Sequence, residues 1–369
     1  RSGAGEVVVI ATTNAKMPEQ RQADLVPAAA TGNAMSPVLS RIRDCRIEQL
    51  AAGEFSLVLE AEAGTGPVAG RARLRGEGLS MPGLVETARQ LRGRSLFARH
   101  PLLEAQGPLI ADAGLRVAVG ACEAVRCDAA ARAAGLSLAG WLGGALKPSL
   151  PVALQMPADA KADAPDGVRR VAVTSGSKAI GELVAGISAA RAGGETELAL
   201  HLAGQVQTGD LAALIAVGRK RGLAHIADPC GDAAAASHAF AGQLPTLALT
   251  AHRYDSAALR AALAAGGAQI LLLDPVALGG PEATRALATL AELHGIEVGL
   301  TAAGGTPWQA HYAAAIAASL AAATEPLVVD AAAAPQLCLD RGRLTVSIRP
   351  GVEDVAPADP APALQRATS

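Results

Sequence analysis

The stretch from Ile270 to Gly280 constrains the fold more than any other part of the sequence. It begins with four apolar residues, continues with Asp274 and Pro275, and ends in two glycines that open a helical pattern over 282–294. Four consecutive apolar residues are typical of a strand covered on both faces, as in a parallel sheet. A polar side chain directly after such a strand lies where α/β barrels place their chemistry.

The same order of strand, polar residue, loop and helix recurs through the second half of the chain. Helical patterns at 178–192, 211–221, 257–265 and 309–323 separate most of the strands, whereas 157–167 reads as a loop. Eight strands that alternate with helices predict an α/β fold with a closed (β/α) barrel. The expected strands are Pro151–Gln155, Val168–Thr174, Glu197–His201, Leu223–Ala227, Thr246–Thr250, Gln269–Leu273, Ile296–Leu300 and Pro326–Val329.

The chain divides into four parts. Residues 1–36 are an extension or a disordered lead-in, in which Met35 is a candidate natural start. Residues 37–148 form an α+β unit, residues 149–350 form the barrel, and residues 351–369, rich in Pro, Ala and Asp, form a disordered tail. Within the α+β unit we expect a hairpin of Phe55–Ala63 and Val68–Leu74, followed by helices near 81–91 and 115–134.

Composition limits the classes of function. A chain of 369 residues is long enough for two domains, and a net charge of −2 argues against nucleic acid or an anionic membrane as partner. The five cysteines form no CxxC pair and are odd in number, which favours a reduced, cytoplasmic protein. Cys122 and Cys127 fall on one expected helix, where packed thiols are more common than metal ligands. No signal peptide or membrane span stands out.

Three segments carry a resemblance to a known family. The segment Val117–Leu150 contains A-C-E-A-V-R-C-D, then G-L-S-L and W-L-G-G; Leu223–Pro229 reads L-A-H-I-A-D-P; and Leu273–Gly280 ends in G-G. Together they resemble the end of the capping domain, the I-E-x-P strand and the sixth barrel strand of enolase-superfamily proteins of the mandelate racemase and muconate lactonizing type. The resemblance runs from about 37 to 345. It implies a TIM-like barrel with an N-terminal α+β capping domain, and a homo-oligomer.

The resemblance also implies chemistry, namely abstraction of a proton next to a carboxylate. In the family, three acidic residues at the ends of the third to fifth strands hold a divalent cation, and bases on the second, sixth or seventh strand move the proton. This sequence departs from that pattern at every position but Asp274. Where the family has K-x-K on the second strand, this sequence has Ala172, Val173 and Thr174. Where the family has its three metal-binding acids, it has His201, Ala227 and Ala251, the last beside His252. The position of the seventh-strand base holds Thr301 or Ala302.

Each candidate residue also has a structural interpretation. Asp274 and Asp228 both precede proline at a strand end, where an aspartate often caps a loop. A lone histidine near a barrel mouth, such as His201, is usually hydrogen-bonded and inert, and His225 within its strand reads as a core histidine. Arg253 could bind a carboxylate, although a surface arginine is the commoner case.

The loop from Ala302 to Trp308 is a candidate anion site. The backbone N–H groups of Gly304 and Gly305 could face a ligand at the start of a helix. A glycine turn with Pro307 at the first helical position explains the same pattern.

Three hypotheses follow. The first is a degenerate family member, a scaffold or a binder of a small-molecule carboxylate through Arg253, Asp228, Gly304 and Gly305, with no cofactor and no metal site. The second is an enzyme whose site is rebuilt from catalytic Asp274, His201 and His252, with Asp228 and Asp330; two histidines and a carboxylate could hold zinc or another transition metal. The third is an ordinary racemase, cycloisomerase or acid-sugar dehydratase. The missing acids count against the third, because Mg²⁺ needs oxygen ligands.

Overall fold

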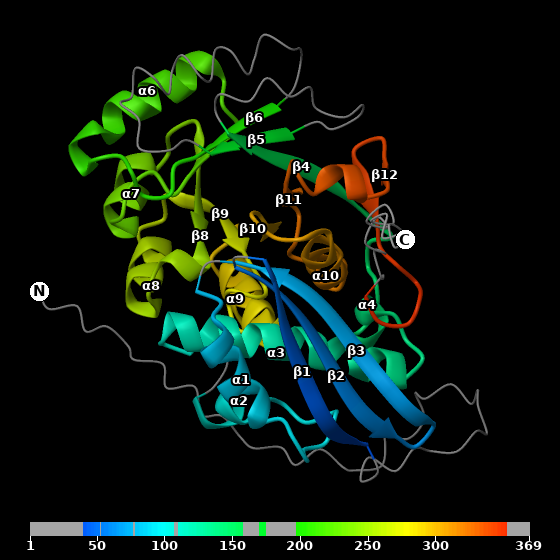
Figure 1. The fold of residues 1–369 in the computed structure, drawn as a ribbon. Coiled ribbons are helices and arrows are strands. Elements are labelled where there is room, and N and C mark those ends of the chain that lie inside the picture. The colour runs from blue at the N-terminus through cyan, green and yellow to red at the C-terminus, as the bar shows by residue number, and fades with distance from the viewer. Residues whose placement is uncertain are drawn as a thin grey trace, which may run out of the picture. The chain divides into compact units, whose positions relative to one another are not determined.

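The core of the structure is a ring of eight parallel strands. A computed structural model describes residues 40–51, 53–76, 78–106, 110–157, 170–174 and 197–352. Each barrel strand pairs with the next in chain order, and the last pairs with the first, so the sheet closes into a barrel as predicted (Figure 1). The barrel strands are β4 (Ser149–Pro157), β5 (Arg170–Thr174), β6 (Glu197–His201), β7 (His225–Ala227), β8 (Thr246–Thr250), β9 (Ala268–Leu273), β10 (Glu297–Ala302) and β11 (Leu327–Asp330).

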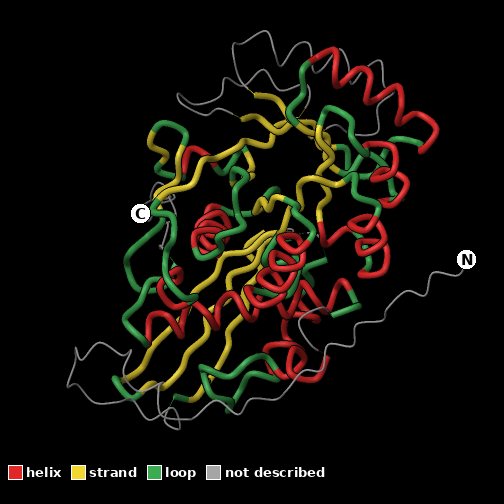
Figure 2. The backbone as a smooth tube through the Cα atoms, turned by 180° about the vertical axis from the view of Figure 1, so that it is seen from behind, coloured by secondary structure: helices red, strands yellow, loops and turns green. Residues whose placement is uncertain are grey.

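Helices lie outside the ring of strands (Figure 2). They are α6 (Leu211–Arg221), α7 (Ala233–Phe240), α8 (Ser256–Ala264), α9 (Pro281–Leu293) and α10 (Pro307–Ala318). The helix expected at 178–192 lies outside the described residues, as does the loop expected at 157–167 except for Pro157, which ends β4.

Several expected boundaries in the barrel differ from the structure, among them those of α10 and β7. Helix α10 begins at Pro307 rather than at residue 309, because Thr306 caps it, and it ends at Ala318 rather than at residue 323. Strand β7 starts only at His225 instead of at Leu223.

The α+β unit contains a three-stranded antiparallel sheet. The predicted hairpin is confirmed as β2 (Glu54–Ala63) and β3 (Gly66–Arg75), and β1 (Arg41–Ala51), which the sequence analysis did not identify, pairs with β2. Alternate residues of β2 such as Leu57 and Leu59 are fully buried, which is the period-2 pattern of a sheet with one covered face. The helices of this unit are α1 (Met81–Arg89), α2 (Pro101–Gln106), α3 (Ala113–Ala133) and α4 (Leu138–Trp141).

Helix α3 holds the α+β unit against the barrel through small residues. A Cβ atom on Gly70 of β3 would lie 2.3 Å from the Val125 carbonyl oxygen, and one on Gly120 would lie 2.0 Å from the Val276 carbonyl oxygen. These distances are shorter than any van der Waals contact, so glycine is required at both close approaches. Cys122 and Cys127 are buried on this helix as predicted, and burial raises the pKa of the Cys127 thiol to about 12.

The C-terminal part of the described chain returns to the α+β unit. Strands β12 (Leu339–Asp340) and β13 (Arg343–Thr345) pair with each other, and β13 pairs with β4. Gly351 and Val352 are buried, and the Val352 N–H donates to Asp128 Oδ1 at 2.6 Å. Gly351 and Val352, the first two residues of the tail expected at 351–369, therefore belong to the fold, and residues 353–369 lie outside the described residues.

Two further findings bear on the class of protein. None of the helices in the described ranges is long and apolar enough to cross a membrane. All five cysteines lie in the described part of the chain, and each is a free thiol.

Candidate functional site

The carboxyl ends of the eight parallel strands meet at one mouth of the barrel. His201 is the last residue of β6 and Ala227 the last of β7, while Asp274 directly follows β9. Side chains at this end of a (β/α) barrel come from different strands but face a shared space, which is why enzymes of this fold place their sites here. Two groups of polar residues occupy the mouth, and they differ in how their charges are satisfied.

The first group, the histidine cluster, consists of His201, His225, Asp228, His252 and Asp274. The Nε2 atoms of His201 and His225 lie 3.3 Å apart, with ring centroids 5.5 Å apart. Burial lowers the pKa of His201 to about 4, an effect that the nearby Asp228 charge only partly opposes. The His201 ring is therefore neutral at pH 7, and its Nε2 either donates to or accepts from the Nε2 of His225, according to its tautomer.

Asp228 is held by three partners. It has a left-handed backbone, with φ of 47°, which aspartate tolerates better than most residues. Its Oδ1 accepts from the Thr250 N–H at 2.7 Å and from the Tyr254 hydroxyl at 3.2 Å, and Arg253 Nε lies 3.4 Å from its Oδ2. The carboxylate thus fixes the turn that follows β8, in agreement with the structural interpretation of Asp228.

Asp274 and His252 each act on the pKa of the other. Burial raises the pKa of Asp274, and His252 opposes that rise; burial lowers the pKa of His252, and Asp274 opposes that fall. Asp274 Oδ1 also accepts from the N–H groups of Val276 and Ala277, at 2.9 and 3.1 Å, so it caps its loop. Among the described residues, His252 Nδ1 is buried without a hydrogen-bond partner.

The strand ends of the histidine cluster do not suit Mg²⁺. A magnesium ion takes oxygen ligands in near-octahedral geometry. The third to fifth strands offer an imidazole at His201 and methyl groups at Ala227 and Ala251, both of which are buried. Asp228, the adjacent carboxylate, is already bound to its three partners. Within the described ranges no group of three His, Cys, Asp or Glu side chains is arranged to hold a metal ion.

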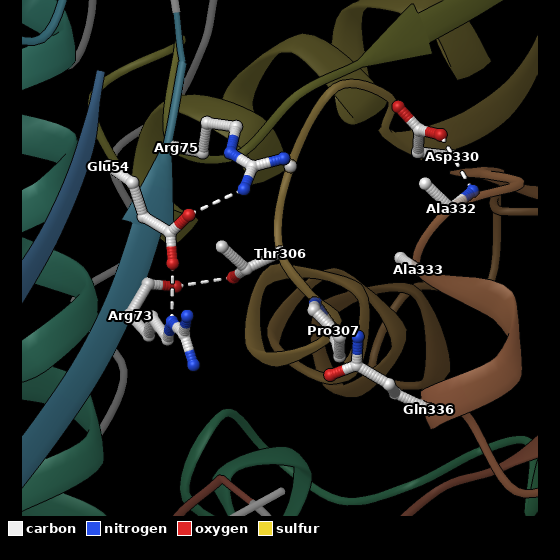
Figure 3. Close-up of a pocket in the computed structure, with 10 residues that line it drawn as sticks. Glu54, Arg73, Arg75, Thr306, Pro307, Asp330, Ala332, Ala333 and Gln336 are labelled. Carbon is white, nitrogen blue, oxygen red and sulfur yellow. Dashed lines mark hydrogen bonds and ion pairs between the residues drawn. The ribbon is translucent and has the colours of Figure 1, made fainter. Parts of the chain in front are cut away.

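The second group, the arginine cavity, lies where β3 meets the ends of β10 and β11. It is a cavity of about 210 Å³. Arg73 Nε and Arg75 Nη2 each lie 2.5 Å from a different oxygen of the buried Glu54 carboxylate (Figure 3). The cavity is lined by Glu54, Arg73, Arg75, Gly305, Thr306, Pro307, Asp330, Ala332, Ala333 and Gln336.

The start of α10 positions both arginines. Thr306 and Gln309 form a capping box, in which the Thr306 hydroxyl accepts from the Gln309 N–H and Gln309 Oε1 accepts from the Thr306 N–H. The same two side chains also hold β3, because Thr306 Oγ1 donates to the Arg73 carbonyl at 2.5 Å and the Gln309 amide bonds to both the N–H and the C=O of Arg75. One helix cap therefore fixes the backbone from which the two arginines extend.

The structure separates some residues that the sequence analysis grouped. Asp228 and Arg253 are in contact, as a shared site requires. Gly305 lines the arginine cavity, whereas Gly304 does not. Asp330 was grouped with His201 in the rebuilt site, but it faces the arginines of β3 because β11 lies between β10 and β4, away from β6.

Sequence reasoning missed Glu54, Arg73, Arg75 and Gln309. A signal for the arginines was present, since R-A-R-L-R at 71–75 alternates and puts three arginines on one face of a strand. T-P-W-Q at 306–309 is a capping-box pattern. Nothing local in the sequence shows that these two segments meet.

The fold and the position of the site define a class, the capped (β/α) barrels. A family model described as "Enolase C-terminal domain-like" matches residues 155–352. The chain belongs to this family, the enolase superfamily of mandelate racemase and muconate lactonizing type, and the resemblance stated from the sequence is confirmed. No curated protein matches the sequence.

Solved structures share the fold at low sequence identity. An isomerase from Streptomyces coelicolor A3(2) is 20% identical, with 85% of this chain and 93% of that chain covered and a TM-score of 0.67. A mandelate racemase/muconate lactonizing protein from Paracoccus denitrificans PD1222, complexed with magnesium, is 18% identical over 85% and 94% of the two chains, with a TM-score of 0.69. An enolase from Mycobacterium smegmatis, complexed with tartrate, is 18% identical over 86% and 89%, with a TM-score of 0.66.

Proposed function

We propose that this protein is a divergent family member that binds a small-molecule carboxylate at the barrel mouth without Mg²⁺-dependent proton abstraction. One observation carries the proposal. The ends of β6, β7 and β8 present His201, Ala227 and Ala251, and the neighbouring Asp228 carboxylate is bound by Thr250, Tyr254 and Arg253.

The chemistry supports the same conclusion. Protons next to a carboxylate are very weakly acidic, so their removal needs both a placed base and strong stabilisation of the developing charge. Loss of one such stabiliser alone typically costs on the order of 10²–10³ in rate. Asp274, the residue that matches the family's catalytic set, has its Oδ1 occupied by two backbone N–H groups.

A second candidate function rests on the pair of His252 and Asp274. Burial brings the pKa values of the imidazole and the carboxyl towards each other, which suits a proton-transfer pair. In this alternative the protein is an isomerase, racemase, cycloisomerase or acid-sugar dehydratase with a rebuilt site that includes His201.

Exchange of substrate protons with solvent tests both candidates. The purified full chain is incubated in D₂O with acid sugars, N-acyl amino acids and muconates, each with and without Mg²⁺, Mn²⁺ or Zn²⁺, and followed by NMR. The expected result is no exchange or turnover with any metal, together with thermal stabilisation by at least one carboxylate. Tartrate, formate and acetate are sensible first probes, because structural relatives are complexed with them.

Two variants separate the candidates. Turnover that disappears in Asp274→Asn and His252→Gln would establish the rebuilt-site enzyme. Mg²⁺-dependent turnover in the unmodified protein would overturn the proposal outright. Elemental analysis and calorimetry with Mg²⁺ report the metal content directly.

The proposal extends to surroundings and assembly. A homo-oligomer is proposed from the family resemblance, and size-exclusion chromatography with light scattering tests it. A cytoplasmic location, without nucleic acid or membrane partners, is proposed from the five free thiols and the net charge of −2.

A further inference from the structure

The arginine cavity has one positive wall. Arg73 and Arg75 are separated by one residue on β3, so their side chains lie on the same face of the strand. Burial alone would raise the pKa of Glu54, but hydrogen bonds and charges from Arg75 and Arg73 lower it overall, so this carboxylate is ionised. Two positive charges against one negative charge leave this wall with a net charge of +1.

The arginines keep hydrogen-bonding capacity towards the cavity. Each guanidinium has five N–H donors, and the contacts with Glu54 involve Nε of Arg73 and Nη2 of Arg75. Both side chains are about half exposed, at 48% and 51%, whereas Glu54 is 4% exposed. The arginines are thus anchored on the buried side and open on the cavity side.

The opposite wall accepts hydrogen bonds. Asp330 lies across the cavity from Arg75 (Figure 3). Its Oδ1 accepts from the Ala332 N–H at 2.9 Å, which fixes the carboxylate at the end of β11. The cavity is therefore polarised, with guanidinium donors on the β3 wall and a carboxylate acceptor on the β11 wall.

We propose that the arginine cavity binds a small carboxylate that carries a hydrogen-bond donor, an amino or hydroxyl group, at its other end. The ligand carboxylate binds Arg73 and Arg75, and the donor binds Asp330. A volume of about 210 Å³ corresponds to roughly seven water molecules, which suits a ligand of a few carbon atoms. The inference rests on the proposed function for the ligand class and adds the place and polarity of binding.

A matched series of four-carbon acids tests the polarity. The full chain is titrated by calorimetry with 4-aminobutanoate, 4-hydroxybutanoate, butanoate and succinate. The expected affinities fall in that order, because Asp330 attracts the ammonium group, accepts from the hydroxyl, gains nothing from the methyl and repels the second carboxylate. A charge-assisted hydrogen bond implies ~10- to 100-fold between the first and third compounds.

Two variants that change the charge of the β3 wall in opposite directions test where the ligand binds. Arg75→Gln should weaken 4-aminobutanoate binding by ~10- to 100-fold. Glu54→Gln should strengthen it, because the β3 wall then carries two positive charges. Loss of packing would shift affinity downwards in both variants, so opposite shifts distinguish ligand contact from structural damage.

Two further variants complete the test. Arg71→Gln is the matched control, since Arg71 lies on the same strand and the same face but does not line the cavity. It should leave affinity unchanged. Asp330→Asn should weaken 4-aminobutanoate, leave butanoate unchanged and strengthen succinate. Circular dichroism verifies folding, and Arg75→Lys, which retains the charge, replaces Arg75→Gln if that variant does not fold.

Several outcomes would overturn the inference. One is an equal affinity of the Arg75→Gln and Arg71→Gln variants for 4-aminobutanoate. Another is that no compound in the series binds the protein. Carboxylate binding that disappears in Arg253→Gln but persists in Arg75→Gln would place the ligand in the histidine cluster, which leaves the proposed function intact. Mg²⁺-dependent proton exchange would end the proposed function whatever the arginine variants show.

Discussion

The histidine cluster and the arginine cavity share one barrel mouth but use their charges differently. In the histidine cluster, Asp228 is bound by Thr250, Tyr254 and Arg253, and His201 faces His225. In the arginine cavity, the two guanidinium groups share one buried carboxylate and retain donors towards open space.

The difference shows that position in a fold does not settle chemical role. The histidine cluster lies where this family keeps its metal, yet its polar groups largely satisfy one another. The arginine cavity draws its charge from the α+β unit, and its carboxylate Glu54 is separated from Asp330 by most of the chain. Four predictions test this contrast.

The largest effect is expected from Asp228→Ala. The variant leaves the buried Thr250 N–H without its acceptor, removes one of the two acceptors of the Tyr254 hydroxyl and places alanine at φ of 47°. We expect a loss of about 3 kcal/mol in the free energy of unfolding, measured by urea denaturation. Asp228→Asn, which retains an acceptor and tolerates this backbone, should lose about half as much. An unchanged midpoint in the alanine variant would contradict the view that Asp228 is structural.

Restoring oxygen ligands should create a magnesium site. The variant His201→Asp, Ala227→Glu and Ala251→Glu places three carboxylates at the ends of β6, β7 and β8, or directly after them. Calorimetry should show Mg²⁺ affinity at least ~100-fold above that of the unmodified protein, about 2.7 kcal/mol. His201→Asp alone is the control and should gain little. Equal Mg²⁺ binding by the unmodified protein and the triple variant would mean that other residues already form a site.

Acid should weaken the fold through His201. Its pKa is about 4 in the folded protein, against an ordinary value near 6.5 in the unfolded chain. The contribution of His201 to the free energy of unfolding is therefore fully present above pH ~6.5. It is lost as the pH falls towards 4, because the unfolded state takes up the proton first. The expected loss is about 2 kcal/mol between pH 7 and 4.5. His201→Gln should lose measurably less over the same interval, and identical pH profiles would show that His201 has no such role.

The smallest effect is expected from Thr306→Val. This change removes the cap of α10 and the hydrogen bond to the Arg73 carbonyl while it preserves side-chain shape. We expect a loss of about 1 kcal/mol in stability and a few-fold loss in carboxylate affinity at the arginine cavity. The control is Thr289→Val, since the Thr289 hydroxyl bonds only a carbonyl of its own exposed helix turn. Carboxylate affinity that is unchanged in Thr306→Val would show that the cap does not position the arginines.

The barrel was predictable because its signals are local. The bounds of α6, β6 and β8 agree with the sequence patterns residue for residue, since each element shows its own apolar period within a few turns or strand residues. The family resemblance supplied the capping domain and the order of the strand ends. It also located His201, Ala227 and Ala251 as the departures from the metal-binding pattern.

The arginine cavity was not predictable for the opposite reason. Arg75 and Gln309 are 234 positions apart, and neither segment contains a pattern that predicts its contact with the other. The apolar alternation of β3 explains why its arginines point away from the core, but not what they face. The same limit applies to Val352, because its partner Asp128 is 224 positions earlier and nothing local in the sequence links the two.

The hydrogen bonds of the Asp128 carboxylate form in a fixed order during synthesis, because its partners lie far apart in the sequence. Its carboxylate accepts from the Arg71 N–H, the Arg132 side chain and the Val352 N–H, which belong to β3, α3 and the end of the barrel. During synthesis the first two partners emerge early, whereas Val352 leaves the ribosome only after all eight barrel strands. Burial raises the pKa of this carboxyl, and the hydrogen bond from the Val352 N–H opposes that rise. The hydrogen bonds of Asp128 are therefore complete only after the whole barrel has been synthesised.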